Sequence, residues 1–157
     1  MGEREADKYQ LVFDIETSDA VRFRALSLKL GKSDADTFRE GAMLVEFFTD
    51  YPDSEQQFLR IEESLRENAP DLSQISKSRS RFIFDLADGA GKRILAIQAK
   101  RDFKDPKDLF LLALRYREDI AIAQDQGIPI NIDFNGKVVD LVKHFENRGK
   151  PFWKRIF

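Results

Sequence analysis

The feature that most constrains this chain is an internal repeat. When the sequence is shifted by 71 residues, residues 13–44 align with residues 84–115 without a gap. Seven of the 32 aligned positions are identical, and the apolar positions keep their spacing. The identical pairs are Phe13/Phe84, Asp14/Asp85, Arg22/Arg93, Ala25/Ala96, Lys29/Lys100, Asp34/Asp105 and Ala42/Ala113. Because a repeated unit is usually one supersecondary motif that its neighbour completes, the repeat predicts two interacting copies of a single motif.

Each copy is predicted to be a strand followed by two helices. The strands are short runs of aromatic and branched residues, which favour a pleated conformation. A turn rich in Ser, Asp and Gly is expected after each strand, before a first helix with apolar residues three or four apart. Ser33 and Asp105 are good N-caps for the second helices. The expected strands are 9–15 and 81–86, and the expected second helices are 34–50 and 106–126.

The rest of the chain extends these two copies. A third helix is predicted at 53–67, with an apolar stripe over an acidic surface, in which the Glu62-Glu63 pair reads as solvated charge. Asn135-Gly136 is a strong hairpin signal between short strands at 130–134 and 137–140. The predicted divisions are the first repeat at 8–50, the acidic helix and linker at 51–80, the second repeat at 81–127, and a basic aromatic extension with a hairpin and a helix at 128–157.

A single strand per copy cannot satisfy its own backbone hydrogen bonds. The natural partner is the strand of the other copy, so we expect 9–15 and 81–86 to pair antiparallel over the four helices. The fold class predicted is α+β, mostly helical. Alternate residues then face the core, namely Leu11, Phe13, Ile15, Phe82, Phe84 and Leu86. The alternative is an α+β domain whose two strands do not pair with each other.

The strand, helix, Gly-x-Ser break and second helix resemble the ribbon–helix–helix fold of Arc/MetJ-type DNA-binding proteins. The similarity is clearest over 25–42 (ALSLKLGKSDADTFREGA), with its small residue, Gly, Ser N-cap and closing Arg-x-x-Ala. The second copy departs from the pattern, with Asp102 in place of the Gly and Lys-Asp-Pro in place of Ser or Thr. The resemblance implies a tandem single-chain form, a pseudo-dimer whose ribbon enters the major groove of double-stranded DNA.

The resemblance also implies which residues contact DNA. Residues that alternate with the core positions face outward, and Gln and Arg are good readers of adenine and guanine. The predicted DNA-binding residues are Gln10, Val12, Asp14, Lys77, Arg79, Arg81, Ile83, Lys104 and Lys107. Asp14 and its counterpart Asp85 are unfavourable beside phosphates. A continuous positive strip on the ribbon therefore favours a role as a DNA-binding regulator or accessory factor, whereas an acidic or apolar ribbon favours a protein partner.

Charge is distributed unevenly along the chain. Residues 1–76 contain 9 Lys/Arg and 17 Asp/Glu, a net −8, whereas residues 77–157 contain 17 and 11, a net +6. The acidic first half motivates an alternative function, a non-enzymatic protein–protein interaction module that retains the fold without DNA binding. Its predicted partner-binding residues lie in the basic aromatic tail and are Lys150, Phe152, Trp153, Lys154 and Arg155.

Signals for catalysis and for metal binding are weak. The chain has no Cys, and its one histidine, His144, has no nucleophile near it in the sequence. We therefore predict no catalytic residues, no metal site and no cofactor, and expect a protein that is not an enzyme. No apolar run approaches the length of a membrane span, and the N-terminus lacks a signal-peptide core, so we expect a cytoplasmic protein.

Overall fold

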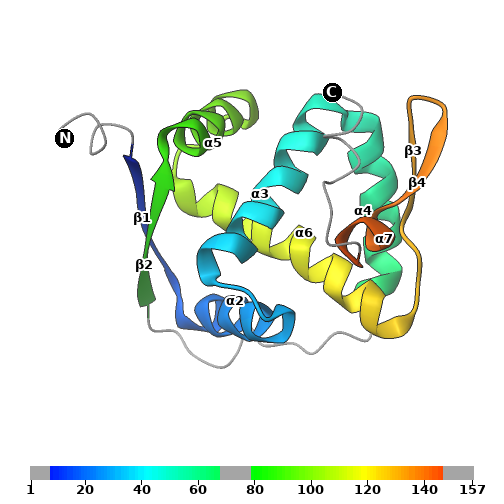
Figure 1. The fold of residues 1–157 in the computed structure, drawn as a ribbon, viewed down its shortest axis with the longest axis horizontal. Helices are drawn as coiled ribbons and strands as arrows, with labels where there is room; N and C mark the ends of the chain where they lie inside the picture. The colour runs from blue at the N-terminus through cyan, green and yellow to red at the C-terminus, as the bar shows by residue number, and fades with distance from the viewer. Residues whose placement is uncertain (1–7, 68–78, 147–157) are drawn as a thin grey trace.

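The two copies of the repeat form the body of the protein in the computed structural model, which describes residues 8–67 and 79–146 (Figure 1). Each copy is a strand followed by two helices, as predicted. The first copy comprises β1 (Lys8–Glu16), α2 (Thr17–Leu30) and α3 (Asp34–Asp50). The second comprises β2 (Arg79–Ala87), α5 (Asp88–Arg101) and α6 (Pro106–Gln126). The fold is α+β and mostly helical, with two small antiparallel sheets.

The two strands pair with each other, which confirms the predicted pairing and excludes the alternative in which they lie apart. β1 and β2 run antiparallel, with Leu11 opposite Phe84 and Phe13 opposite Phe82. Val12 lies opposite Ile83, the residue 71 positions later and therefore its counterpart in the repeat. The repeat and the register thus share one pseudo-two-fold axis, which passes through this central pair. We call the two paired strands the ribbon.

The inner face of the ribbon covers an aromatic core. The six residues predicted to face inward are all buried. The Phe13 ring lies 4.7 Å from that of Phe110, and the Phe84 ring lies 5.0 Å from that of Phe38. Burying a phenylalanine contributes about 1.5–3 kcal/mol. This burial lets a two-stranded ribbon, which is marginal alone in water, form part of a stable fold.

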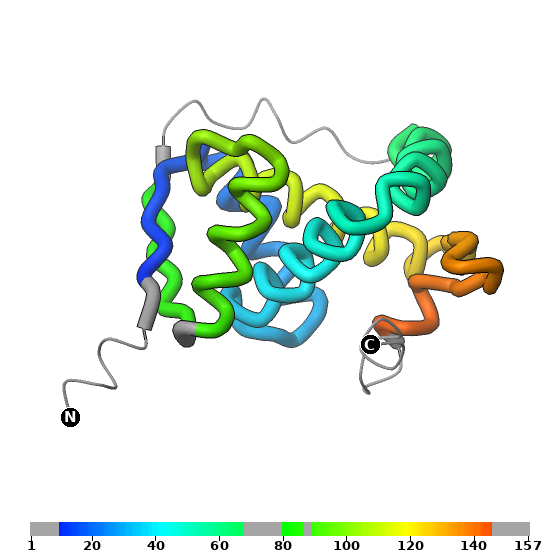
Figure 2. Tube along the Cα trace, turned by 90° about the horizontal axis from the view of Figure 1, so that it is seen from above, coloured from blue at the N-terminus to red at the C-terminus, as the bar shows by residue number. Residues whose placement is uncertain are grey.

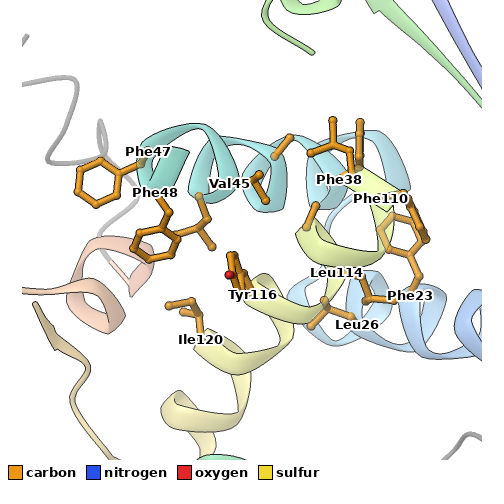
Figure 3. Packing of buried hydrophobic residues seen from close by; sticks show 14 of the residues in the cluster. Phe23, Leu26, Phe38, Val45, Phe47, Phe48, Phe110, Leu114, Tyr116 and Ile120 are labelled. Atoms are coloured by element: carbon orange, nitrogen blue, oxygen red, sulfur yellow. The ribbon is translucent and has the colours of Figure 1, made fainter. Parts of the chain in front are cut away.

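The second helices cross at the centre of the molecule. α3 and α6 make the most extensive contact between helices, and Figure 3 shows Val45 and Phe48 of α3 directed toward Tyr116 and Ile120 of α6. Gly41 sits at the closest approach, where an added Cβ would lie 2.3 Å from the carbonyl oxygen of Ala113. The absence of a side chain at Gly41 therefore sets how closely the two helices pack.

Ion pairs join each first helix to the second helix of the other copy. Arg22 of α2 donates to Glu118 of α6 at 2.6 Å, and Arg93, the counterpart of Arg22, donates through Nε to Glu46 of α3 at 2.9 Å. The same exchange recurs two helical turns further along α2 and α5. Its pairs are Lys29 with Asp125 and Lys100 with Asp50. Since the contacts cross between copies, neither copy is a separate unit.

Helix boundaries follow the predicted signals at most positions. The Ser33 hydroxyl accepts a hydrogen bond from the Asp36 amide at 3.1 Å, and the Asp105 carboxylate accepts one from the Lys107 amide at 2.9 Å. Both predicted N-caps are therefore confirmed. α6 ends at Gly127, which has the left-handed φ of +66° that favours glycine after a helix.

The predicted turn between each strand and its first helix is wrong. β1 ends at Glu16 and α2 begins at Thr17, while β2 ends at Ala87 and α5 begins at Asp88. The polar residues there occupy the first turn of a helix instead. An acidic residue such as Asp19 is favourable in that turn because it faces the positive end of the helix dipole.

The remaining elements lie at the end of the molecule away from the ribbon (Figure 2). They are α4 (Pro52–Arg66), β3 (Asn131–Phe134), β4 (Lys137–Asp140) and α7 (Leu141–Glu146). The predicted hairpin is confirmed, with Asn135 and Gly136 both at positive φ. Phe58 of α4 packs against Phe48 and Tyr116 with ring separations of 5.0 and 5.1 Å. Across the described residues, no helix combines the length and apolar character that a membrane crossing requires.

Replacing Gly41 with alanine should destabilise the protein by about 2–3 kcal/mol, because the new methyl group overlaps backbone that cannot move without separating α3 from α6. Gly89 in α5 has no atom within 4 Å of the corresponding position, so Gly89→Ala is the matched control and should be neutral or slightly stabilising. Urea denaturation followed by circular dichroism measures both. Equal effects of the two substitutions would contradict the proposed role of Gly41.

Candidate functional site

The ribbon has one face that no helix of the described residues covers. The helices of residues 8–67 and 79–146 all lie on the other side of the two strands (Figure 1). Side chains that alternate with the buried ones form this outer face, as predicted, and each is exposed or partly exposed. They are Gln10, Val12, Asp14 and Glu16 of β1, and Arg81, Ile83 and Asp85 of β2. The outer face is therefore a surface of seven described side chains on a rigidly supported pair of strands.

The outer face has an apolar centre with a polar pair on either side. Val12 and Ile83 are 42% and 55% exposed and lie opposite each other on the pseudo-two-fold axis. Gln10 lies opposite Asp85 toward one end, and Arg81 lies opposite Asp14 toward the other. The axis exchanges these two pairs, so a Gln on one strand corresponds to an Arg on the other.

Each aspartate on the outer face holds a polar side chain of the opposite strand. Gln10 donates from Nε2 to Asp85 at 3.1 Å. Arg81 donates from Nε to one oxygen of Asp14 at 3.0 Å and from Nη2 to the other at 3.4 Å. The hydrogen bond with Asp14 raises the pKa of Arg81 further above its usual range. The two aspartates therefore orient the two side chains best suited to read base edges.

The ribbon does not carry a continuous positive strip. Among the seven described side chains of the outer face, one is basic (Arg81) and three are acidic (Asp14, Glu16 and Asp85). The formal charge of these seven side chains is therefore −2, with an apolar pair at the centre of the face. By the criterion set from the sequence, this surface is less favourable to phosphates than a DNA-binding ribbon with an excess of basic residues.

Of the other residues predicted to contact DNA, Lys104 and Lys107 have described side chains, whereas Lys77 and the side chain of Arg79 do not. Lys104 is exposed in the break before α6, and Lys107 is half-buried in its first turn, at the end of α6 that lies beside the ribbon (Figure 1). Asp105 and Asp108 occupy the same helix terminus. Arg79 belongs to β2, but its side chain lies outside the described part. Lys77 and the predicted partner-binding residues also lie outside the described residues, namely Lys150, Phe152, Trp153, Lys154 and Arg155.

A network of charged side chains that sequence reasoning missed ties α4 to the repeat. Glu62 was predicted to be solvated with Glu63, and this is wrong, because its side chain is only 7% exposed and accepts from Arg115 Nε at 2.6 Å. Arg66 donates to Glu118 at 2.5 Å and to the fully buried Asp119 at 2.7 Å. The position of Glu62 on the apolar stripe, four residues after Phe58, was the available signal for its burial.

This network surrounds a charged cleft of ≈ 400 Å³ between α2, α4 and α6. Arg22, Arg66 and Arg115 all line the cleft, and each of them is bonded to a carboxylate. Burial, together with the interaction with Glu62, raises the pKa of Asp119 to about 9, although the pairing with Arg66 acts to lower it. Burial would also raise the pKa of Glu62, but hydrogen bonds with Arg115 and Asp119 lower it below its usual range.

Nothing in these arrangements resembles a reaction centre. The outer face of the ribbon contains no nucleophile paired with a base, and within residues 8–67 and 79–146 no group of three or more His, Asp or Glu is placed to hold a metal ion. No known protein family, curated protein or solved structure matches this chain significantly. The chemistry available on the ribbon is hydrogen bonding and apolar contact, which is the chemistry of a binding surface.

Stability should fall as the pH rises, because of Asp119. Since its pKa is raised in the native state, unfolding above about pH 4 releases a proton, and the stabilisation is lost progressively up to about pH 9. Asp119→Asn imitates the protonated acid and should flatten this dependence. Urea unfolding between about pH 5 and pH 9 measures it.

Asp125→Asn provides the control, because Asp125 forms only an exposed pair with Lys29. This variant should retain the pH dependence of the unsubstituted protein. An Asp119→Asn variant that retains it as well would show that Asp119 ionises normally in the native state.

Proposed function

We propose that this chain is a single-chain ribbon–helix–helix protein that binds duplex DNA by placing the outer face of the ribbon in the major groove. It would act as a DNA-binding regulator or accessory factor. The observation that carries the proposal is the pseudo-two-fold ribbon, with Gln10 and Arg81 at equivalent positions on an uncovered face. The major groove admits a two-stranded ribbon, and Gln and Arg match the edges of adenine and guanine.

The packing of the helices supports the same proposal. Two strand–helix–helix units share one ribbon, their second helices cross on the axis, and their first helices are bonded to the opposite copy. These are the relations expected when two copies of a ribbon–helix–helix unit are joined in one chain. Since one fold can serve unrelated functions, the proposal depends on the side chains of the ribbon rather than on this likeness.

The aspartates are compatible with base reading because their bonds are exposed. The Arg81 and Asp14 side chains are 66% and 43% exposed, and water screens exposed pairs so strongly that they contribute little to stability. Arg81 can therefore exchange part of this bond for a guanine edge. Asp14, which stays beside it, can accept from a cytosine amino group, so that together the pair matches a G·C base pair.

The charge of the outer face affects how the ribbon could bind DNA. Its seven described side chains include one cation and three anions, so they neutralise few phosphates and non-specific affinity should be low. Recognition must then come mainly from contacts with base edges. We expect the logarithm of the affinity to fall only shallowly with the logarithm of the salt concentration.

Selection from a pool of random-sequence duplexes with the full chain should enrich one sequence class. Arg81→Ala should lower affinity for the enriched sequence by about tenfold, because one bidentate base contact is lost. Lys137→Ala removes an exposed cation from the hairpin at the far end of the molecule and should have no effect. Shift assays at about 50 and 200 mM salt measure these affinities. Failure to enrich any sequence, or equal binding by the Arg81→Ala variant, would reject the proposal.

The apolar centre of the outer face favours a second candidate, a protein-interaction module without DNA binding. Val12 and Ile83 expose adjacent apolar side chains, and the hydrogen-bonded pairs beside them resemble the polar rim of a protein interface. Replacing both residues with serine should then abolish retention of a protein partner on the immobilised chain after nuclease treatment. Retention that the double variant preserves would count against this candidate.

A further inference from the structure

The pseudo-two-fold axis relates two grooves, one between α2 and α6 and one between α3 and α5. Next to the ribbon, the α2/α6 groove is closed from within, because the rings of Phe23 and Phe110 pack 4.8 Å apart and both are buried. The charged cleft on this side is lined by α2, α4 and α6 and not by the ribbon. Their counterparts in the α3/α5 groove are Ile94 and Arg39. Two aromatic rings of the closed groove are thus replaced by a smaller side chain and by an exposed cation in the other.

The α3/α5 groove consequently contains an open pocket. Its volume is ≈ 90 Å³, and its apolar walls include Phe38, Met43, Leu86 and Ile94. Arg39, Glu46 and Arg93 are its charged lining residues. The pocket reaches the inner face of the ribbon through Leu86, whose counterpart Ile15 is buried against the closed groove.

The packing in the α2/α6 groove indicates which kind of ligand the α3/α5 pocket could bind. At positions related by the axis, the protein itself supplies aromatic rings that pack edge to face and tilted against the ribbon, with Phe23 lying 5.5 Å from Phe82. An external ring in the α3/α5 pocket would occupy the space that Phe23 and Phe110 fill in the other groove, and it would meet Phe38, whose counterpart there is Leu109. A dry engineered cavity of about 150 Å³ holds benzene. A pocket of ≈ 90 Å³ that is open at one side therefore suits one ring, inserted in part.

The charges at the pocket favour an anionic group on that ring. Arg93 is bonded to both oxygens of Glu46, so those two charges cancel. Arg39 is 59% exposed, and its one ion pair among the described residues is with Asp36, one turn away, at 3.3 Å. Such a pair contributes little, so the Arg39 guanidinium keeps donors for a carboxylate, which it can bind through two parallel hydrogen bonds.

We propose that the α3/α5 pocket binds a small aromatic carboxylate, with the ring against Ile94 and Met43 and the carboxylate on Arg39. The proposal does not depend on DNA binding. Because Leu86 belongs to β2 and Ala90 to the start of α5, a ligand there contacts the junction between the ribbon and its supporting helix. A ligand bound at this site could therefore change the position of β2 relative to α5.

Phenylacetate serves as the probe, and Met43 as the reporter, since Met1 is the only other methionine. In the full chain carrying ¹³C-methyl methionine, phenylacetate should shift the Met43 signal saturably, with a Kd of about 1–10 mM for a ligand of this size. Phenylacetamide, which has the ring without the charge, should bind at least about fivefold more weakly. No saturable shift of Met43 overturns the proposal, and equal affinity for the amide overturns the role assigned to Arg39.

Variants locate the site. Ile94→Phe places in the pocket the residue found at position 23 and should abolish the shift of the Met43 signal by phenylacetate. Ala90→Leu narrows the same pocket and should also abolish this shift, so it provides a second test if Ile94→Phe folds poorly. Arg39→Gln should reduce the affinity for phenylacetate to that for phenylacetamide. Arg24→Gln, a matched change of an exposed arginine on α2, should leave both affinities unchanged. Undiminished binding by either pocket-filling variant would show that phenylacetate binds elsewhere.

Discussion

The pairing of β1 with β2 is the contact on which the rest of the structure depends. Each copy has one strand, whose backbone donors and acceptors are unsatisfied until the other copy provides them. Once Val12 lies opposite Ile83, the axis of the ribbon is set. The crossing of α3 over α6 at Gly41 and the exchange of ion pairs between copies follow the same axis. The two copies therefore form one structural unit, although it is made from a repeat.

The extension breaks the symmetry of the repeat and gives the two sides different properties. α4 reaches α5 through the pair of Glu55 with Arg101, and on the α6 side its residues Arg66 and Glu62 bond to Asp119 and Arg115. Phe145 of α7 lies over the buried Arg117, with its ring 4.5 Å from the guanidinium. The counterpart of Arg117 is Glu46, which lines the open pocket of the other side. Next to the ribbon, one groove is thus closed by aromatic rings, while its equivalent contains an accessible apolar pocket.

Much of the fold could be predicted from the sequence because its signals are local. The caps at Ser33 and Asp105, the Asn135-Gly136 turn and the alternation of Phe82, Ile83 and Phe84 each act over a few residues. The position of Glu62 four residues after Phe58 is a local signal for its burial, but its pairing with Arg115 could not be predicted in this way, because Arg115 is distant in sequence. The Arg81–Asp14 and Gln10–Asp85 bonds lie between these cases. They can be predicted from the sequence only if each strand is assumed to pair with its repeat counterpart so that Val12 lies opposite Ile83.

The outer face of the ribbon combines symmetric geometry with unequal chemistry. Gln10 and Arg81 stand at the same distance in register from the central pair, and each is held by an equivalent aspartate. A homodimer would necessarily present the same residue at both positions, because its two strands are identical. Joining the copies in one chain removes that constraint and allows the two ends of the ribbon to diverge. A ligand that meets Gln10 at one end meets Arg81 at the other, so a palindromic site cannot satisfy both ends equally. On a duplex, the described side chains of the outer face, with one cation and three anions, add little attraction to phosphates, so this difference between the ends would decide where and in which orientation the chain binds.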